Sequence, residues 1–244
     1  MLDLPVGEVH VWWARPHFES GWELLLDETE RRRLEGYRRR EDQARFLTGT
    51  TLVRCLYAVE LGILPAQVAL DRSCADCRRP HGKVRLAGDQ PGGVQVSLSH
   101  AGDWVVVVAY RGRPVGVDVE RVDLGLDHLG IGALALNEDE LGALRAMSAE
   151  HRPVALTTSW VRKEAVVKAL GEGLRTPLHG FGVTAPDASA GVVSWPARPD
   201  LPGRLQLRDI ACDDVHRAAV AVLDAPPVRV VRHDADALRA AAGS

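Results

Sequence analysis

Few cysteines and no long apolar run distinguish this 244-residue sequence, and each scarcity excludes a class of protein. Four cysteines are too few for the disulfide framework of a small secreted domain. The longest apolar run, Trp104 to Tyr110, is far shorter than the roughly 20 residues that a membrane-spanning helix needs. The N-terminus lacks the basic and apolar regions of a signal peptide. We therefore expect a cytoplasmic protein that has no membrane partner.

The sequence also lacks an excess of charge of one sign and a Gly-rich phosphate loop. Its formal net charge is −3, which gives no indication of a nucleic-acid partner. No Walker or Rossmann glycine pattern occurs, so nucleotide binding through those loops is not expected. The length and the 46% hydrophobic content allow a sizeable core, in one domain or in two small lobes.

A single CxxC pair, Cys74 and Cys77, raises the question of a metal or redox site. No second pair completes a four-ligand zinc site, although His81 lies near enough in the sequence to be a third ligand. A reduced pair in a turn-rich loop is the simpler interpretation.

Hydrophobic periodicity and capping signals predict a mixed set of helices and short strands. In the first half, the predicted elements are a strand at 8–13, helix from Asp27 to about Leu61 with a break near Glu41, a loop at 71–93 and strands at 94–98 and 104–110. In the second half, they are strands at 115–120, 181–184, 191–195, 205–207 and 218–223, and helices from Asn137 to about Ser148 and from about Ala155 to Leu170. The Ala-rich tail after Val231 is either a weak peripheral helix or disordered. Helices and strands are segregated in each half, which favours the α+β class.

The segment Gly116–Glu120 carries two acids on one strand. Side chains alternate along a strand, so Asp118 and Glu120 share a face and lie roughly 6.6 Å apart along it. Two carboxylates so placed repel each other unless a cation lies between them, and Mg²⁺ accepts such oxygen ligands. A solvated face at a sheet edge would have the same pattern.

Two further segments have chemistry-bearing residues at ordered spacing. Trp160, Glu164 and Lys168 lie at i, i+4 and i+8 and so share one face of a helix. Glu164 and Lys168 could be a simple surface ion pair, but the tryptophan on the same face argues against full exposure. His100 follows Ser99 at the end of a strand, in a predicted turn 99–103, where it could bind a phosphate or lie free on the surface.

Together, and in this order, these segments resemble the 4′-phosphopantetheinyl transferase superfamily. The family signatures G-[IV]-D-[IVL]-E and W-x-x-K-E-x-x-x-K match Gly116–Glu120 and Trp160–Lys168 at every signature position. Ser99 and His100 stand at the place of the family's SH element, and the stretch 40–46 is similar to its arginine-bearing helix. The loop before the SH element departs from the pattern, because Val84 follows Gly82 and Lys83 where the family often has proline.

The resemblance covers roughly residues 8–223, and this length is similar to that of the Sfp-like class. That class implies two similar lobes of antiparallel strands packed with helices, related by a pseudo-two-fold axis, with the active site in the cleft between them. On this basis we expect an N-terminal lobe at 1–112, a C-terminal lobe with the metal-site motifs at 113–230 and a tail at 231–244. One such chain would suffice as a monomer.

The resemblance also implies the reaction and the roles of single residues. The enzyme would transfer 4′-phosphopantetheine from coenzyme A to a serine of an acyl- or peptidyl-carrier protein and release adenosine 3′,5′-bisphosphate. Asp118, Glu120 and Glu164 would bind Mg²⁺, Glu164 would be the base, and Lys168 would neutralise the diphosphate. His100 and Arg45 would hold the 3′-phosphate of coenzyme A, with Ser99 close by, and Arg33 and Lys83 would be further coenzyme A contacts.

Two non-catalytic alternatives stay open at this point. In one, the arginine-rich helical segment contacts RNA or another polyanion and the acids are structural. In the other, a transferase-like protein binds coenzyme A without turnover. The absence of a recognisable nucleic-acid motif and the intact acids favour the enzyme over both alternatives.

Overall fold

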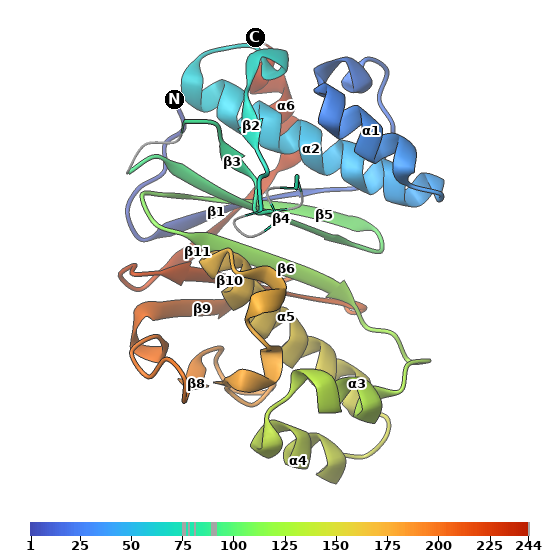
Figure 1. Ribbon diagram of the computed structural model, residues 1–244, viewed down its shortest axis with the longest axis vertical. Coiled ribbons are helices and arrows are strands. Elements are labelled where there is room, and N and C mark those ends of the chain that lie inside the picture. Colours follow the sequence, from blue (N-terminus) through green and yellow to red (C-terminus); the bar gives the residue numbers. More distant parts are fainter. Residues whose placement is uncertain (75–76, 78, 81, 89–91, 244) are drawn as a thin grey trace. The chain divides into compact units, whose positions relative to one another are not determined.

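The computed structural model describes residues 1–243 except 75–76, 78, 81 and 89–91, and its helices and strands form two compact units. The first unit contains Met1–Gly112 and Arg229–Ser244, and the second contains Arg113–Val228. Figure 1 shows both units, and each is described here by itself.

The first unit is built on a four-stranded sheet in the order β11-β1-β5-β4. The strands are β1 (Glu8–Ala14), β4 (Val94–Ala101), β5 (Trp104–Arg111) and β11 (Arg229–Asp234). β4 and β1 are both antiparallel to β5, whereas β11 is parallel to β1. A separate two-stranded pairing joins β2 (Leu70–Asp71) and β3 (Arg85–Leu86).

Helices cover one face of this sheet (Figure 1). They are α1 (Glu28–Gly36), α2 (Arg40–Leu61) and α6 (Ala235–Ala242), with short 3-10 turns at Trp22–Leu25 and Pro65–Gln67. The core between α2, α6 and the sheet is formed mainly by Leu52, Leu56, Val96, Val105, Val107 and Leu238, all buried. α2 has no polar face over most of its length, because it is enclosed by this core and by a second cluster around Trp22 and Phe46.

The second unit has a three-stranded antiparallel sheet in the order β6-β10-β9. Its strands are β6 (Val115–Arg121), β9 (Leu205–Asp209) and β10 (His216–Leu223). α5 (Arg152–Leu170) packs on one face of this sheet, and Pro153 in its first turn suits a helix start. The helix ends at Gly171, whose φ of 71° places it in the left-handed region that favours glycine.

The remaining elements of the second unit surround α5. They are α3 (His128–Ala135), α4 (Glu138–Ala146), β7 (Gly182–Val183), β8 (Val192–Ser194) and 3-10 turns at Gly173–Arg175, Leu178–Gly180 and Pro202–Arg204. The core between α5 and the sheet is formed mainly by Val161, Ala165, Phe181, Trp195, Leu207, Ala219 and Ala221.

The helices and strands follow the same order along the chain in both units. Each has a first strand, a short capped helix, a long helix, a small pair of strands and then a hairpin, namely β1-α1-α2-β2-β3-β4-β5 and β6-α4-α5-β7-β8-β9-β10, with α3 inserted in the second. In each sheet the last hairpin strand lies between the other two, as β1-β5-β4 and as β6-β10-β9. The α+β class is therefore confirmed, with two similar units.

Two predicted boundaries are wrong. The first helical segment breaks at Tyr37–Arg39 and not near Glu41, because Tyr37 and Arg39 take extended backbone angles. Ser99 and His100 lie inside β4 and not in a turn, since Gly102, with a φ of 52°, allows a two-residue turn and pairing continues to Ala101 and Trp104.

The C-terminal tail contains a helix, one of the two alternatives that the sequence left open, but this helix is not peripheral. Residues 229–234 extend the first sheet as β11, and Ala235 and Leu238 of α6 are buried in the first unit's core. The tail expected at 231–244 is therefore an integral part of that unit, because its small and apolar residues recur on one helical face. The sequence pattern did not predict α3, the strand β2 at the start of the predicted loop 71–93 or the strand β3 inside it.

None of the helices in the described part of the chain is both long and apolar enough to cross a membrane.

Candidate active site

Gly116 brings β6 and α5 into direct contact. A Cβ atom at this position would lie 2.1 Å from the carbonyl oxygen of Ala165 and 2.2 Å from the backbone nitrogen of Ala169, and both distances are impossible for real atoms. Only glycine therefore permits this approach. The signature glycine of the G-[IV]-D-[IVL]-E segment thus sets the distance between the strand and the helix that carry the predicted acids and lysine.

Asp118 and Lys168 form an ion pair across this contact. Asp118 faces α5 because it is paired with Ala219, whose methyl group belongs to the core under that helix. Its side chain is 3% exposed, and the Lys168 ammonium donates to Oδ1 of Asp118 at 2.5 Å. The strand acid and the helix lysine that the sequence singles out are therefore brought together.

The pKa values of Glu120 and Glu164 are shifted by burial and by the charges of Asp118 and Lys168. Loss of solvation raises the pKa of Glu120 to about 7, with further increases from Asp118 and Glu164 and an opposing effect of Lys168. Loss of solvation, and then Asp118, also raises the pKa of Glu164, and Lys168 again opposes the shift. All three acids therefore lie in one electrostatic cluster with Lys168, and a carboxylate whose pKa is raised toward 7 is suited to accept a proton at neutral pH.

The cluster suits a hard divalent cation by its chemistry. Three carboxylates from a strand and a helix offer only oxygen ligands, which Mg²⁺ prefers, and their mutual repulsion would be relieved by a bound cation. The ligand atoms of these three acids do not all lie within 4.8 Å of one another. In this arrangement Lys168 supplies the positive charge next to Asp118.

Lys163, the first lysine of the W-x-x-K-E-x-x-x-K signature, is a site-positioning residue to which the sequence analysis assigned no role. Its side chain is fully buried, and its ammonium binds Glu140 at 2.6 Å and donates to the carbonyl oxygens of Leu178 and Phe181. Burial lowers the pKa of Lys163, while Glu140 opposes that change. Because Lys163 directly precedes Glu164, these contacts fix the rotation of α5 about its axis. The signal that could have identified this role was the signature lysine itself, which stands outside the helix face shared by Trp160, Glu164 and Lys168.

Arg162 fixes the same helix on another side. Its guanidinium is completely buried and makes bidentate contacts with Asp209 at 2.6 and 2.9 Å. It also donates to the carbonyl oxygens of Thr184, Ala185 and Ala188. Bidentate arginine contacts define direction as well as distance. Two adjacent buried cations therefore hold α5 in register with the sheet.

In the first unit, the packing of α2 on β4 places Arg45 and His100 at the same height along the contact between the helix and the strand. Tyr57 of α2 donates to the carbonyl oxygen of Val94, and Gly49 packs on the side chain of Leu98, so α2 and β4 run in opposite directions. Arg45 lies about 6 Å beyond Gly49 along the helix, and His100 lies about 6.6 Å beyond Leu98 along the strand.

The side chains of Arg45 and His100 also share a side of their elements. His100 is two residues after Leu98 and so lies on the same face of the sheet, opposite Val105, which also packs at Gly49. Arg45 precedes Gly49 by four residues and so lies on the same face of α2. Arg45 keeps a side-chain exposure of 19% and pairs loosely with Asp42 at 3.6 Å. The geometry therefore brings the two predicted phosphate ligands to one place.

Arg33 extends this basic group, whereas Ser99 does not. The guanidinium carbon of Arg33 lies 5.3 Å from the centre of the Phe46 ring, next to Arg45 in the chain. The buried Ser99 is paired with Val106, and strand alternation turns its side chain to the sheet face opposite His100. Lys83 precedes β3 in a half-buried position, where loss of solvation and then Arg85 lower its pKa to about 7.

The cysteine pair of the sequence analysis is only partly described. Cys74 and Cys77 are not in disulfides, and His81, the possible third ligand, lies outside the described residues. A different group, formed by Cys212, Asp213 and His216, has ligand atoms that all lie within 4.8 Å of one another. That group lies in the turn between β9 and β10 and had not been expected from the sequence.

Comparison with known proteins gives family matches in both halves of the chain. Residues 114–221 match the family model described as the 4′-phosphopantetheinyl transferase superfamily. Residues 13–112 match the model described as 4′-phosphopantetheinyl transferase, N-terminal. The first match contains the acid cluster and Lys168, and the second contains Arg33, Arg45 and His100.

Individual relatives agree with these matches. A phosphopantetheinyl transferase of Thraustochytrium sp. is 30% identical over 242 residues, which cover 89% of this chain and 80% of the relative. A 4′-phosphopantetheinyl transferase of Bacillus subtilis is 26% identical over 65% of this chain and 66% of the relative. One of Aneurinibacillus migulanus is 27% identical over 59% of this chain and 55% of the relative.

Proposed function

Because this chain belongs to the 4′-phosphopantetheinyl transferase superfamily, we propose that it moves the 4′-phosphopantetheine group of coenzyme A onto a serine of an acyl- or peptidyl-carrier protein. The chain is a transferase, as its named relatives are, and the non-catalytic alternatives are not favoured. The observation that carries the proposal is the electrostatic cluster of Asp118, Glu120, Glu164 and Lys168 around the contact made by Gly116.

Asp118, Glu120 and Glu164 would hold Mg²⁺, as their all-oxygen donor set supports. A bound Mg²⁺ would neutralise and orient the diphosphate of coenzyme A. Lys168, already directed at Asp118, would add a second positive charge for the same diphosphate. Phosphoryl transfer depends mainly on such positioning and charge neutralisation.

Glu164 would accept the proton of the carrier serine, directly or through water. The serine oxygen attacks the phosphorus that bears the pantetheine group, and the bond from that phosphorus to adenosine 3′,5′-bisphosphate breaks. The serine proton passes to Glu164, whose pKa is raised by burial and by Asp118. The negative charge of the leaving group is balanced by Lys168.

Arg45, His100 and Arg33 would bind the 3′-phosphate of coenzyme A. Their support is the shared level and face of Arg45 and His100, together with the neighbouring position of Arg33. Lys83 and Ser99 are further proposed contacts; Ser99 would have to act from the opposite sheet face. A single chain with both family segments supports a monomer. A cytoplasmic location and the absence of nucleic-acid and membrane partners stay predictions from the sequence.

The proposal is tested by the mass of a carrier protein. Purified chain, coenzyme A, Mg²⁺ and an apo carrier protein should give a carrier heavier by one phosphopantetheine group, and removing Mg²⁺ with a chelator should stop the reaction. Glu164→Gln should slow turnover at least about 100-fold, the usual contribution of a general base. Asp139→Asn, at an exposed acid in the first turn of α4, is the matched control and should keep the wild-type rate. An unchanged carrier mass across a panel of carriers would contradict the proposed function.

A further inference from the structure

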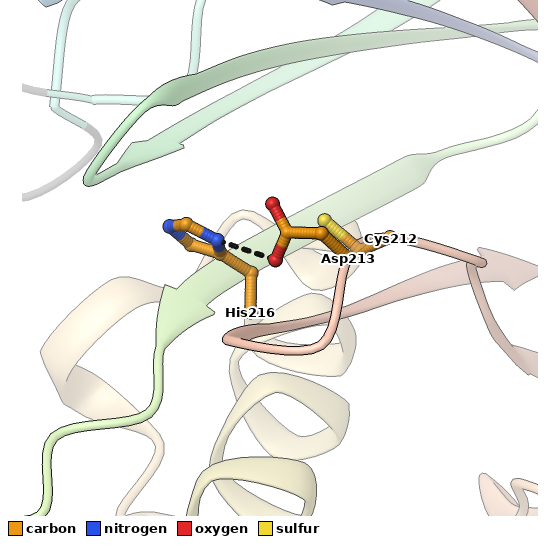
Figure 2. Close-up of side chains that lie close together, drawn as sticks. All are labelled: Cys212, Asp213 and His216. Carbon is orange, nitrogen blue, oxygen red and sulfur yellow. Dashed lines mark hydrogen bonds and ion pairs between the residues drawn. The ribbon is translucent and has the colours of Figure 1, made fainter.

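The turn between β9 and β10 gathers three metal-ligating side chains of different kinds. Cys212, Asp213 and His216 lie within five consecutive positions, and one possible ligand atom of each lies within 4.8 Å of the others. Figure 2 shows the carboxylate of Asp213 between the thiol of Cys212 and the ring of His216. Neither family signature includes these residues.

His216 is the buried member of the group. Its side chain is completely inaccessible, and its Nδ1 hydrogen-bonds Oδ1 of Asp213 at 2.8 Å (Figure 2). Its other ring nitrogen, Nε2, has no hydrogen-bond partner among the residues that the structure describes and lies on the side of the ring away from Asp213 and Cys212 (Figure 2). Nδ1 is therefore the ring nitrogen that faces the group and would bind an ion together with Asp213 and Cys212.

Asp213 holds the turn in a shape that presents the ligands together. Its Oδ1 also accepts from the backbone N–H of Val215 at 3.1 Å, so one carboxylate fixes both the turn and the ring of His216. Cys212 is half-buried and is not part of a disulfide. A turn fixed in this way loses little conformational entropy when an ion binds.

The group opens into a cavity through which an ion can enter. The cavity has a volume of about 530 Å³, and Cys212, Asp213 and His216 line it together with His151 and Asp209. Asp209 is paired with the buried guanidinium of Arg162, and Nδ1 of His151 hydrogen-bonds the hydroxyl of Ser148. Among the described residues that line the cavity, Cys212, Asp213 and His216 are the ones whose ligand atoms all lie within 4.8 Å of one another.

We propose that Cys212, Asp213 and His216 bind one Zn²⁺ ion, with a fourth position left for water. A thiolate, an imidazole and a carboxylate are the three side-chain ligands that zinc uses in proteins, whereas Mg²⁺ avoids sulfur. The ion would tie the turn to the start of β10, the strand that pairs Arg217 with Glu120 of β6. The site does not depend on the proposed transferase reaction.

Cobalt(II) reports on this site directly, because a thiolate ligand gives a sulfur-to-cobalt charge-transfer band that oxygen ligands cannot give. Metal-free full-length chain is titrated with Co²⁺ in excess Mg²⁺, which occupies oxygen-only sites, and Zn²⁺ is then added. The expected result is one equivalent of Co²⁺ with a sulfur band that Zn²⁺ abolishes. Cys212→Ser should lose the band, and Asp213→Asn should weaken binding at least about tenfold.

The matched control is the double variant Cys74→Ser/Cys77→Ser, which removes the other cysteine pair and should keep the full band. Excess Zn²⁺ should raise the melting temperature of the wild type and of this double variant, but not that of Cys212→Ser. The proposal is overturned if the wild type gives no sulfur band, if the band persists in Cys212→Ser, or if it is lost in the double variant.

Discussion

The carboxylate of Glu140 forms an ion pair with the ammonium of Lys163 at 2.6 Å inside the second unit. The same carboxylate also caps the N-terminus of α4. The first unit has the same arrangement one repeat earlier. Glu30 caps α1 and binds the buried guanidinium of Arg54 on α2 at 2.6 Å. In both units, the capping glutamate of the short helix therefore holds a buried cation of the long helix, which is a residue-level sign of the shared chain order.

Lys163→Met should destabilise the protein strongly. The substitution leaves the carboxylate of Glu140 half-buried without its cation and removes the donor for the carbonyls of Leu178 and Phe181. Breaking a buried pair in this way costs about 3 kcal/mol or more of the free energy of unfolding. For a chain of this size, that corresponds to a fall of about 6–12 °C in the melting temperature.

The control for this prediction is Arg204→Met, which breaks the solvent-exposed pair of Arg204 with Asp224. Exposed pairs contribute little to stability. Urea unfolding of both variants gives the comparison, and equal losses would mean that Lys163 does not have the anchoring role described above.

Gly116→Ala should separate β6 from α5. The added methyl group would meet backbone atoms of Ala165 and Ala169, which cannot move out of the way as a flexible side chain can. We expect a loss of about 3 kcal/mol or more in the free energy of unfolding, at or above the upper end for overpacked cores, and a loss of turnover. Asp118 and Lys168 would no longer meet at 2.5 Å.

Gly142→Ala is the matched control, because this glycine lies inside α4 and a Cβ there meets nothing within 4 Å. Replacing an exposed helical glycine by alanine should stabilise the chain by roughly 0.5–1 kcal/mol. A Gly116→Ala variant that melts at the wild-type temperature and keeps activity would contradict the close approach of strand and helix.

Those parts of the fold and of the site in which the local sequence pattern agrees with the packing could be predicted from the sequence. The alternation of side chains along 115–120 placed Asp118 and Glu120 on one face of the strand β6. The helical spacing placed Glu164 and Lys168 on one face of the helix α5. The capping boxes at Asp27 and Asn137 fixed two helix starts, because their signal is entirely local.

Non-local pairing and burial were not predictable in the same way. β11 pairs with β1 across more than 200 positions, and no local pattern encodes that parallel contact. Helical spacing alone does not reveal that Arg162 and Lys163 are fully buried, because the carbonyl oxygens that they bind belong to the segment 178–188. The sequence also gave no reason to single out His216, whose burial depends on the sheet around it.

Acid should weaken the attachment of the C-terminal segment. His233 of β11 and His10 of β1 hydrogen-bond through ring nitrogens at 2.9 Å. Burial lowers the pKa of both rings from 6.5, and in His10 the charge of His233 lowers it further while Glu8 opposes the change. The folded chain therefore binds fewer protons than the unfolded chain, so stability is full above about pH 6.5 and falls as the pH drops below it.

Hydrogen exchange at pH 7.5 and about pH 5.5 measures this effect, and the amides of β11 and α6 should lose protection at the lower pH. His233→Gln removes one of the two charges and should flatten the pH dependence of those amides. Protection that stays constant across this range in the wild type would show that the histidine pair does not titrate as described.

Arg45→Gln should weaken the binding of coenzyme A much more than that of dephospho-coenzyme A, because only the former carries the 3′-phosphate that Arg45 and His100 are proposed to hold. A charge-assisted hydrogen bond contributes about 1.5–3 kcal/mol, which corresponds to roughly 10- to 150-fold in the dissociation constant. His100→Gln should act in the same direction, since both side chains lie at one level of the α2–β4 contact. Arg39→Gln, at the exposed N-cap of α2, controls for a general loss of positive charge and should change neither affinity. Titration calorimetry with the two ligands separates the outcomes: an Arg45→Gln variant that loses affinity equally for both would place the 3′-phosphate elsewhere, because the lost contact would then lie on a part of the ligand that the two molecules share.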